Sequence, residues 1–218
     1  LNGESLKVSA DIEPSEEDIS IIKLNKILII EYIKKRTVIL RSINKVKPQD
    51  DYLVSSSQRR LWVLSKFEGA NQAYNIPKIS RLVGVIDEEA FTKSYQKLLE
   101  RHEVLRSVFT EDKEGTPRQL ILPSTDDRFS VLLIDYSNEI KEVRENLIAT
   151  FVESEVNQSF NLATGPLIKC SLIKESEGNY IWILIMHHIV SDGWSMGVLH
   201  RDWSELYNSE LSHKQADL

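Results

Sequence analysis

Two adjacent histidines and the acidic turn that follows them are the residues of this sequence most able to do chemistry. His187 and His188 come directly after the apolar run Ile181 to Met186, and Asp192 and Gly193 lie shortly beyond them. Histidine suits general base work because its unperturbed pKa is about 6.5. Gly193 would allow a positive φ angle, or a close approach of a substrate to backbone N–H groups. We therefore expect acid–base chemistry in this turn.

The histidine pair has two other interpretations. Paired histidines at a strand end can be structural, with one ring in the core and the other in solvent. A metal site would need both imidazoles and Asp192 as ligands. Adjacent strand residues point to opposite faces, so His187 and His188 cannot easily converge on one ion. We expect one histidine to reach a cleft, the other to pack, and no metal to bind.

Three predicted elements would position this turn. The apolar run 180–186 reads as a buried strand, and residues 167–173 read as its neighbour, joined by a hairpin loop over 175–179. Trp194 to Tyr207 is expected to be a helix. A buried strand fixes the backbone while the side chains beyond its end can meet a cleft. The site is therefore expected between the strand and the helix.

The rest of the chain interleaves helical and strand-like segments. Residues 55–67 predict a helix, a second begins after Asp87 and carries Phe91 to His102, and a third covers 139–158. The predicted strands are residues 78–86, 117–122 and 129–134. This order favours an α/β domain with a mixed β-sheet flanked by helices over a helical bundle or an all-β sandwich.

The amino-terminal region has a different pattern. Residues 2–9 contain an Asn-Gly turn and then an alternating segment, which indicates the second arm of a β-hairpin. A helical, amphipathic pattern starts at Pro14, with acids in its first turn. A polar stretch with one proline follows it. We place a boundary near residue 47, which gives an appendage over 1–47 and a main domain over 48–218.

Composition excludes several classes of function. The 218 residues are 41% hydrophobic and 28% charged with a net charge of -6, and no basic stripe suits nucleic acid. The longest apolar run is far below the ~18 residues of a membrane span. The single cysteine, Cys170, is expected in the core. We therefore expect a cytoplasmic protein. The sequence starts at Leu1 without a methionine, so we also expect missing sequence.

Three motifs carry a resemblance to a known family. Residues 55–62 (SSSQRRLW), 101–109 (RHEVLRSVF) and 186–195 (MHHIVSDGWS) resemble, in order and spacing, the first three core motifs of condensation domains in nonribosomal peptide synthetases. The resemblance covers residues 53 to about 210. Ser57 stands where the family prefers alanine, and Ser107 where it prefers threonine. HHxxxDG alone is shared with other acyltransferases that resemble chloramphenicol acetyltransferase.

The resemblance implies a fold and a set of site residues. It implies a chloramphenicol acetyltransferase-like lobe, the first of two in such domains, and the motifs of the second lobe have no counterpart here. His188 would be the catalytic group, either taking a proton from the acceptor amine or orienting it. His187 and Asp192 would support it, and Asp192 would pair with Arg60 or Arg106. Gly193, also part of the motif, would let the donor thioester come close.

The implied reaction is amide formation between a donor acyl or peptidyl thioester and an acceptor aminoacyl amine. Both would be carried on phosphopantetheine arms of peptidyl carrier proteins, with no cofactor bound directly, as in the biosynthesis of natural products such as antibiotics. A fragment without its second lobe could instead be a non-catalytic docking or carrier-binding module. A free-standing acyltransferase that uses coenzyme A is a third possibility.

Residues 1 to about 41 also partly resemble the docking domains that precede some condensation domains. In these a hairpin and helices receive a strand-forming tail of the upstream synthetase subunit, so strand addition is the expected recognition mode. The alternative is a linker helix packed on the condensation lobe.

Overall fold

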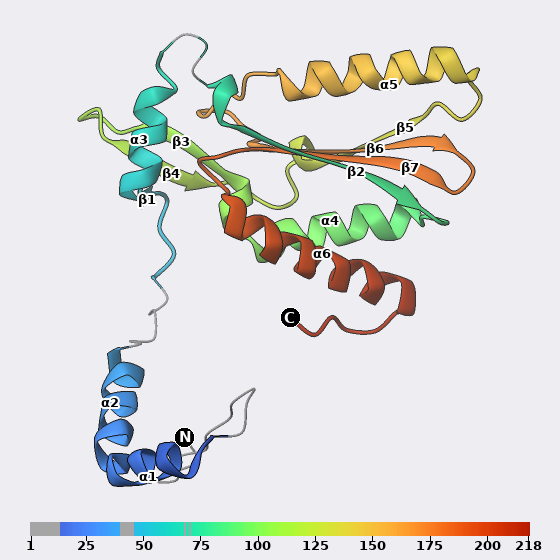
Figure 1. Cartoon of the computed structure of the whole chain (residues 1–218). Helices are drawn as coiled ribbons and strands as arrows, with labels where there is room; N and C mark the ends of the chain where they lie inside the picture. Colours follow the sequence, from blue (N-terminus) through green and yellow to red (C-terminus); the bar gives the residue numbers. More distant parts are fainter. Residues whose placement is uncertain (1–13, 40–45, 68, 70) are drawn as a thin grey trace. The chain divides into compact units, whose positions relative to one another are not determined.

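The computed structural model describes residues 14–39, 46–67, 69 and 71–218, and the chain divides into two compact units (Figure 1). The first unit is Leu1–Pro48 and the second is Gln49–Leu218. The hairpin arm predicted over residues 2–9 lies outside the described residues.

Two helices form the described part of the first unit. α1 (Glu16–Leu24) begins after Ser15, whose hydroxyl accepts a hydrogen bond from the Asp18 N–H, while the Asp18 carboxylate accepts one from the Ser15 N–H. Asn25 separates α1 from α2 (Lys26–Ile39), and its side-chain amide donates to a carbonyl of α1, a local bond that competes with continued helix. No side chain of α1 is buried, so this helix contributes no core of its own.

A four-stranded mixed sheet forms the centre of the second unit. Its spatial order is β2-β7-β6-β5. β7 pairs antiparallel with both of its neighbours, whereas β5 and β6 are parallel. The strands are β2 (Asn75–Val83), β5 (Val131–Asp135), β6 (Ile168–Ser176) and β7 (Asn179–His187). The predicted α/β class with a mixed sheet is therefore confirmed.

Helices cover both faces of this sheet (Figure 1). α5 (Lys141–Val156) lies on one face, and α4 (Glu88–Arg101) and α6 (Gly193–Ser212) lie side by side on the other. α4 begins after Asp87, whose carboxylate accepts the N–H of Ala90 at 2.9 Å. Three of the four helices predicted for the main domain thus form the layers on either side of the sheet.

The central strand β7 belongs to two hydrophobic cores at once. Its even-numbered residues pack in the core beneath α4 and α6, and its odd-numbered residues pack in the core on the α5 face. The even set is Tyr180, Trp182, Leu184 and Met186, and the odd set is Ile181, Ile183 and Ile185. Because both faces are buried, the sequence of this strand is apolar without alternation.

The second unit also contains a smaller antiparallel sheet, which was not predicted as a separate sheet from the sequence. It has the order β1-β4-β3. Its strands are β1 (Tyr52–Leu53), β3 (Ser107–Glu111) and β4 (Pro117–Ile121). The remaining helical segments are α3 (Ser56–Leu64) and three 3₁₀ turns, η1 (Gln72–Tyr74), η2 (Glu103–Arg106) and η3 (Asp127–Phe129).

Several predicted element ends were displaced. β2 starts three residues before the predicted strand and ends before Gly84, which has a φ of 125° that L side chains rarely adopt. α6 runs five residues past Tyr207, to Ser212.

Cys170 is 2% exposed, so its predicted place in the core is confirmed, and burial raises the pKa of its thiol. Within the described ranges, no helix has the length and apolarity to cross a membrane.

Candidate active site

The two histidines at the end of β7 have opposite environments. His187 is the last residue of the strand and is fully buried, and its N–H donates to the carbonyl of Leu167 at 3.0 Å. His188 is exposed, and its N–H donates to the carbonyl of Tyr74 at 2.8 Å. The chain turns after residue 187, so only the second imidazole can meet a ligand from solvent.

His187 supports the turn as a neutral imidazole. Its Nδ1 accepts the N–H of Ile189 at 3.1 Å, which assigns the proton of the neutral ring to Nε2. Burial, helped by the neighbouring His188, lowers the pKa of His187 to about 4. The rings of Tyr74 and Phe160 lie 6.2 Å from its centroid. His187 therefore fixes the backbone that follows it and carries no charge near neutral pH.

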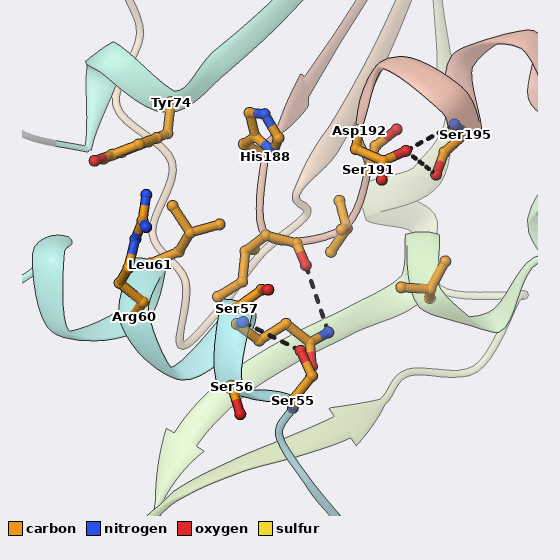
Figure 2. A pocket seen from close by; sticks show the side chains of 14 residues that line it. Ser55, Ser56, Ser57, Arg60, Leu61, Tyr74, His188, Ser191, Asp192 and Ser195 are labelled. Carbon is orange, nitrogen blue, oxygen red and sulfur yellow. Dashed lines mark hydrogen bonds between the residues drawn. The ribbon is translucent and has the colours of Figure 1, made fainter.

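Asp192 organises the start of α6. Its carboxylate accepts the N–H of Ser195 at 2.7 Å and the hydroxyl of the same residue at 2.6 Å (Figure 2). These hydrogen bonds hold the pKa of the Asp192 carboxyl below its ordinary value. Asp192 is thus the N-cap of the helix that follows the histidine turn.

The expected ion pair between Asp192 and an arginine is not formed. Arg106 is only 8% exposed and donates through Nε to the carbonyl of Leu99 at 2.7 Å and through Nη1 to that of Leu122. The last turn of a helix leaves carbonyls without partners, and that of Leu99, in the last turn of α4, accepts from this guanidinium. Within the described part of the chain, no salt bridge joins Asp192 to Arg60 either.

Of the two reasons considered for Gly193, a positive φ angle is not used, which leaves the close approach of a substrate. Gly193 is the first residue of α6, and its φ lies outside the left-handed region. A Cβ built on Gly193 would meet no atom within 4 Å. The space beside this residue is open, as a close approach of a ligand would require.

The first motif reaches the histidine turn through one glutamine. α3 begins after Ser55, and Gln58 completes a capping box by accepting the Ser55 N–H at 2.9 Å. The other end of the same amide donates to the carbonyl of Ile189 at 3.5 Å. This role of Gln58 was not predicted from the sequence, although Ser-x-x-Gln is a recognisable capping signal.

A cleft of about 820 Å³ lies between the start of α3, the turn after β7 and the start of α6 (Figure 2). His188 and Arg60 both line it, but Arg106 does not. The other lining residues are Ser55, Ser56, Ser57, Gln58, Leu61, Tyr74, Val104, Ile189, Val190, Ser191, Asp192 and Ser195. The cleft thus offers one exposed imidazole, several hydroxyls and one guanidinium on a partly apolar floor.

The second motif contributes Val104 to this cleft, but two of its charged or polar residues, Arg101 and His102, fasten α4 to α6 instead. Asp202 of α6 is 1% exposed, and its carboxylate accepts from His102 at 2.9 Å, from Arg101 at 3.1 Å and from Arg201 at 2.8 Å. Burial acts to raise the pKa of Asp202, but the hydrogen bonds from Arg201, His102 and Arg101 leave it below its ordinary value. The role of Asp202 could not be read from the sequence, because its partners on α4 are about 100 residues away.

Comparison with known proteins places the second unit in a family. The condensation-domain family model matches residues 48–218. The chain is 36% identical over 172 residues to chondramide synthase of Chondromyces crocatus, and 37% identical over 169 residues to surfactin synthase subunit 1 of Bacillus subtilis. Each match covers 78% of this chain and 4% of the relative. The chain belongs to the condensation-domain family.

Solved structures agree on the fold. The starter condensation domain of the rhizomide synthetase matches with a TM-score of 0.68 at 20% identity, over 77% of this chain and 41% of that one. The first condensation domain of the calcium-dependent antibiotic synthetase matches with a TM-score of 0.69 at 19% identity, over 77% and 40%. The predicted chloramphenicol acetyltransferase-like fold is confirmed, and the chain spans about two fifths of these domains.

Proposed function

We propose that the second unit is the amino-terminal lobe of a peptide-synthetase condensation domain and that His188 acts on the acceptor amine. The observation that carries this proposal is the contrast between the two histidines. His187 is buried and neutral, whereas His188 is exposed on a large cleft at the end of a rigid strand. Family membership and the three motifs in register support the reaction class.

The reaction is aminolysis of a thioester. The acceptor amine nitrogen attacks the donor carbonyl carbon, so that a C–N bond forms and the C–S bond breaks. The proton that the amine loses balances the thiolate, which leaves as a thiol. His188 either takes that proton as a general base or orients the amine through a hydrogen bond. Both substrates arrive on phosphopantetheine arms of carrier proteins, which are the partners we propose.

A second lobe would supply the opposite wall of the cleft. This chain spans 41% and 40% of the two condensation-domain structures it was compared with. His188, Asp192 and Arg60, which come from three different elements of this lobe, all line the cleft. We expect this chain alone to form no amide from loaded donor and acceptor carriers, and a longer protein that carries both lobes to form it.

His188→Ala in the two-lobe protein tests the catalytic assignment. A positioned acid–base group contributes roughly 10²- to 10⁴-fold, so amide formation should slow by that factor. His200→Ala is the matched control, because His200 is exposed on α6 but does not line the cleft. An unchanged rate in His188→Ala would show that the assignment is wrong.

The pH profile separates the two roles of His188. If His188 is a base, the rate of amide formation should rise with pH in the wild-type protein, and His188→Gln should lose this rise. If it orients the amine, His188→Gln should lower the rate without changing the shape of the profile.

We further propose that the first unit binds the carboxyl-terminal tail of an upstream synthetase subunit. The supporting observation is its exposed apolar surface: Leu24, Ile27 and Leu28 are 87%, 74% and 65% exposed. Calorimetry with the tail peptide of the upstream subunit should show binding that Leu24→Asp weakens at least tenfold. Val85→Asp, at an equally exposed position of the second unit, is the control. Equal binding by Leu24→Asp would contradict docking on this surface.

A further inference from the structure

Ser191 is a buried hydroxyl without a partner, three residues after His188. The residue is 7% exposed, and its Oγ has no hydrogen-bond partner among the residues that the structure describes. A buried, unpaired hydroxyl costs about 1 to 3 kcal/mol, so native proteins rarely keep one without a use. Ser191 therefore needs an explanation that the fold alone does not give.

Three other polar groups of the same turn are already occupied, although Nε2 of His187 has no partner among the described residues. The N–H of His188 is bonded to Tyr74, the carbonyl of Ile189 to Gln58, and the carboxylate of Asp192 to Ser195. Each of these bonds holds the turn in place. The Ser191 hydroxyl takes no part in that network, so it is free to bond to something else.

Ser191 lines the same cleft as His188 (Figure 2). Serine has three staggered positions of its hydroxyl about χ1, and moving between them requires no change of backbone. For the buried Oγ of Ser191 to reach a ligand in the cleft, its χ1 would have to rotate in this way. A ligand in the cleft with a hydrogen-bond acceptor would then satisfy it.

Resting on the function proposed above, we propose that the Ser191 hydroxyl donates a hydrogen bond to the carbonyl oxygen of the donor thioester. That oxygen is the acceptor closest to the reaction, since His188 is assigned to the amine. As the C–N bond forms, the carbonyl π electrons move onto the oxygen, and they return when the C–S bond breaks. A hydrogen bond to this oxygen is stronger in the transition state, in which the oxygen carries more negative charge, than in the ground state.

Ser191→Ala and Ser191→Thr in the two-lobe protein test this assignment. Loss of one such donor lowers kcat on the order of 10²-fold, with little change in KM for the donor carrier. Ser191→Thr keeps the hydroxyl and should keep most of the rate. Ser204→Ala is the control, because Ser204 is exposed on α6 and does not line the cleft.

Thermal unfolding distinguishes this role from a structural one. Removing a buried hydroxyl that has no partner should leave Tm unchanged or raise it, so Ser191→Ala should be as stable as the wild type while its kcat falls. A parallel fall of Tm and kcat would overturn the proposal. So would a full rate in Ser191→Ala while His188→Ala is inactive, and that result would leave the proposed function standing. If the wild-type two-lobe protein formed no amide, the proposed function itself would fail.

Discussion

The two aspartates of α6 show how differently one helix can use the same side chain. Asp192, at the N-terminus, is exposed and bonds only within its own turn, to Ser195. Asp202, in the middle of the helix, is buried and bonds to Arg101, His102 and Arg201. The motif aspartate, for which an arginine partner was expected, has none among the described residues, and the aspartate outside the motifs has two.

Burial explains the difference. A carboxylate removed from water must be compensated by charge and hydrogen bonds, whereas an exposed one is compensated by solvent. The helix thus has an end that is held only locally, beside the cleft, and a middle that is fastened to α4. We expect substitutions at the two regions to differ in kind: large losses of stability in the middle and smaller ones at the end.

The largest expected effect comes from removing the partners of Asp202. The double variant Arg101→Ala/His102→Ala leaves a buried carboxylate with one cation, and the free energy of unfolding should fall by roughly 3 to 5 kcal/mol. Chemical denaturation measures this loss. Adding Asp202→Ala to the double variant should restore part of the stability, because the buried carboxylate, whose Oδ2 would have lost its partners, is then gone. If the triple variant were the least stable of all, the buried charge would not be the cause.

The next effect is a loss of stability in acid, which we expect from His187 at the end of β7, in the region before the start of α6. Its folded-state pKa of about 4 lies below the unfolded value of about 6.5, so the unfolded chain binds more protons between these values. This contribution to stability is fully present above pH 6.5 and is lost as the pH falls toward 4, a change of roughly 3 kcal/mol.

His187→Asn checks this origin, because asparagine offers an acceptor to Ile189 but does not titrate. The free energy of unfolding should vary less between pH 6.5 and 4 in His187→Asn than in the wild type. An identical pH dependence in both proteins would assign the acid sensitivity to another group.

The smallest effect is expected at Asp192. Asp192→Ala removes the N-cap of α6, and Tm should fall by about 2 to 4 °C. Asp192→Asn keeps the capping acceptor and should fall less. A loss as large as that of the Arg101→Ala/His102→Ala variant would break the contrast between the two regions.

Helices and strands that have a clear local pattern of apolar residues could be predicted from the sequence. α4, with its acidic cap and regular apolar face, was predicted almost to its ends, and β7 was found from its unbroken apolar run. The division of strands into two sheets was not predicted, because sheet membership depends on pairing between distant segments. The different environments of His187 and His188 arise because β7 ends at His187 and the chain turns there, not from alternation within the strand.

The partners of charged groups could not be predicted in the same way. From the motif, Arg106 was expected close to the reacting groups, but its guanidinium donates hydrogen bonds to the carbonyls of Leu99 and Leu122. Nothing local marks Asp202 as the group that receives Arg101 and His102. Such pairs follow from which side chains the fold removes from water, and that is known only when the helices are packed.

Gln58 links the start of α3 to the histidine turn, and both segments border the cleft. Its oxygen closes the capping box at the start of α3, and its nitrogen holds the carbonyl of Ile189 in the histidine turn. Fraying of α3 and release of the turn therefore break bonds of the same side chain. We expect the two segments to open as one cooperative unit, with amide hydrogens on both exchanging at a common rate.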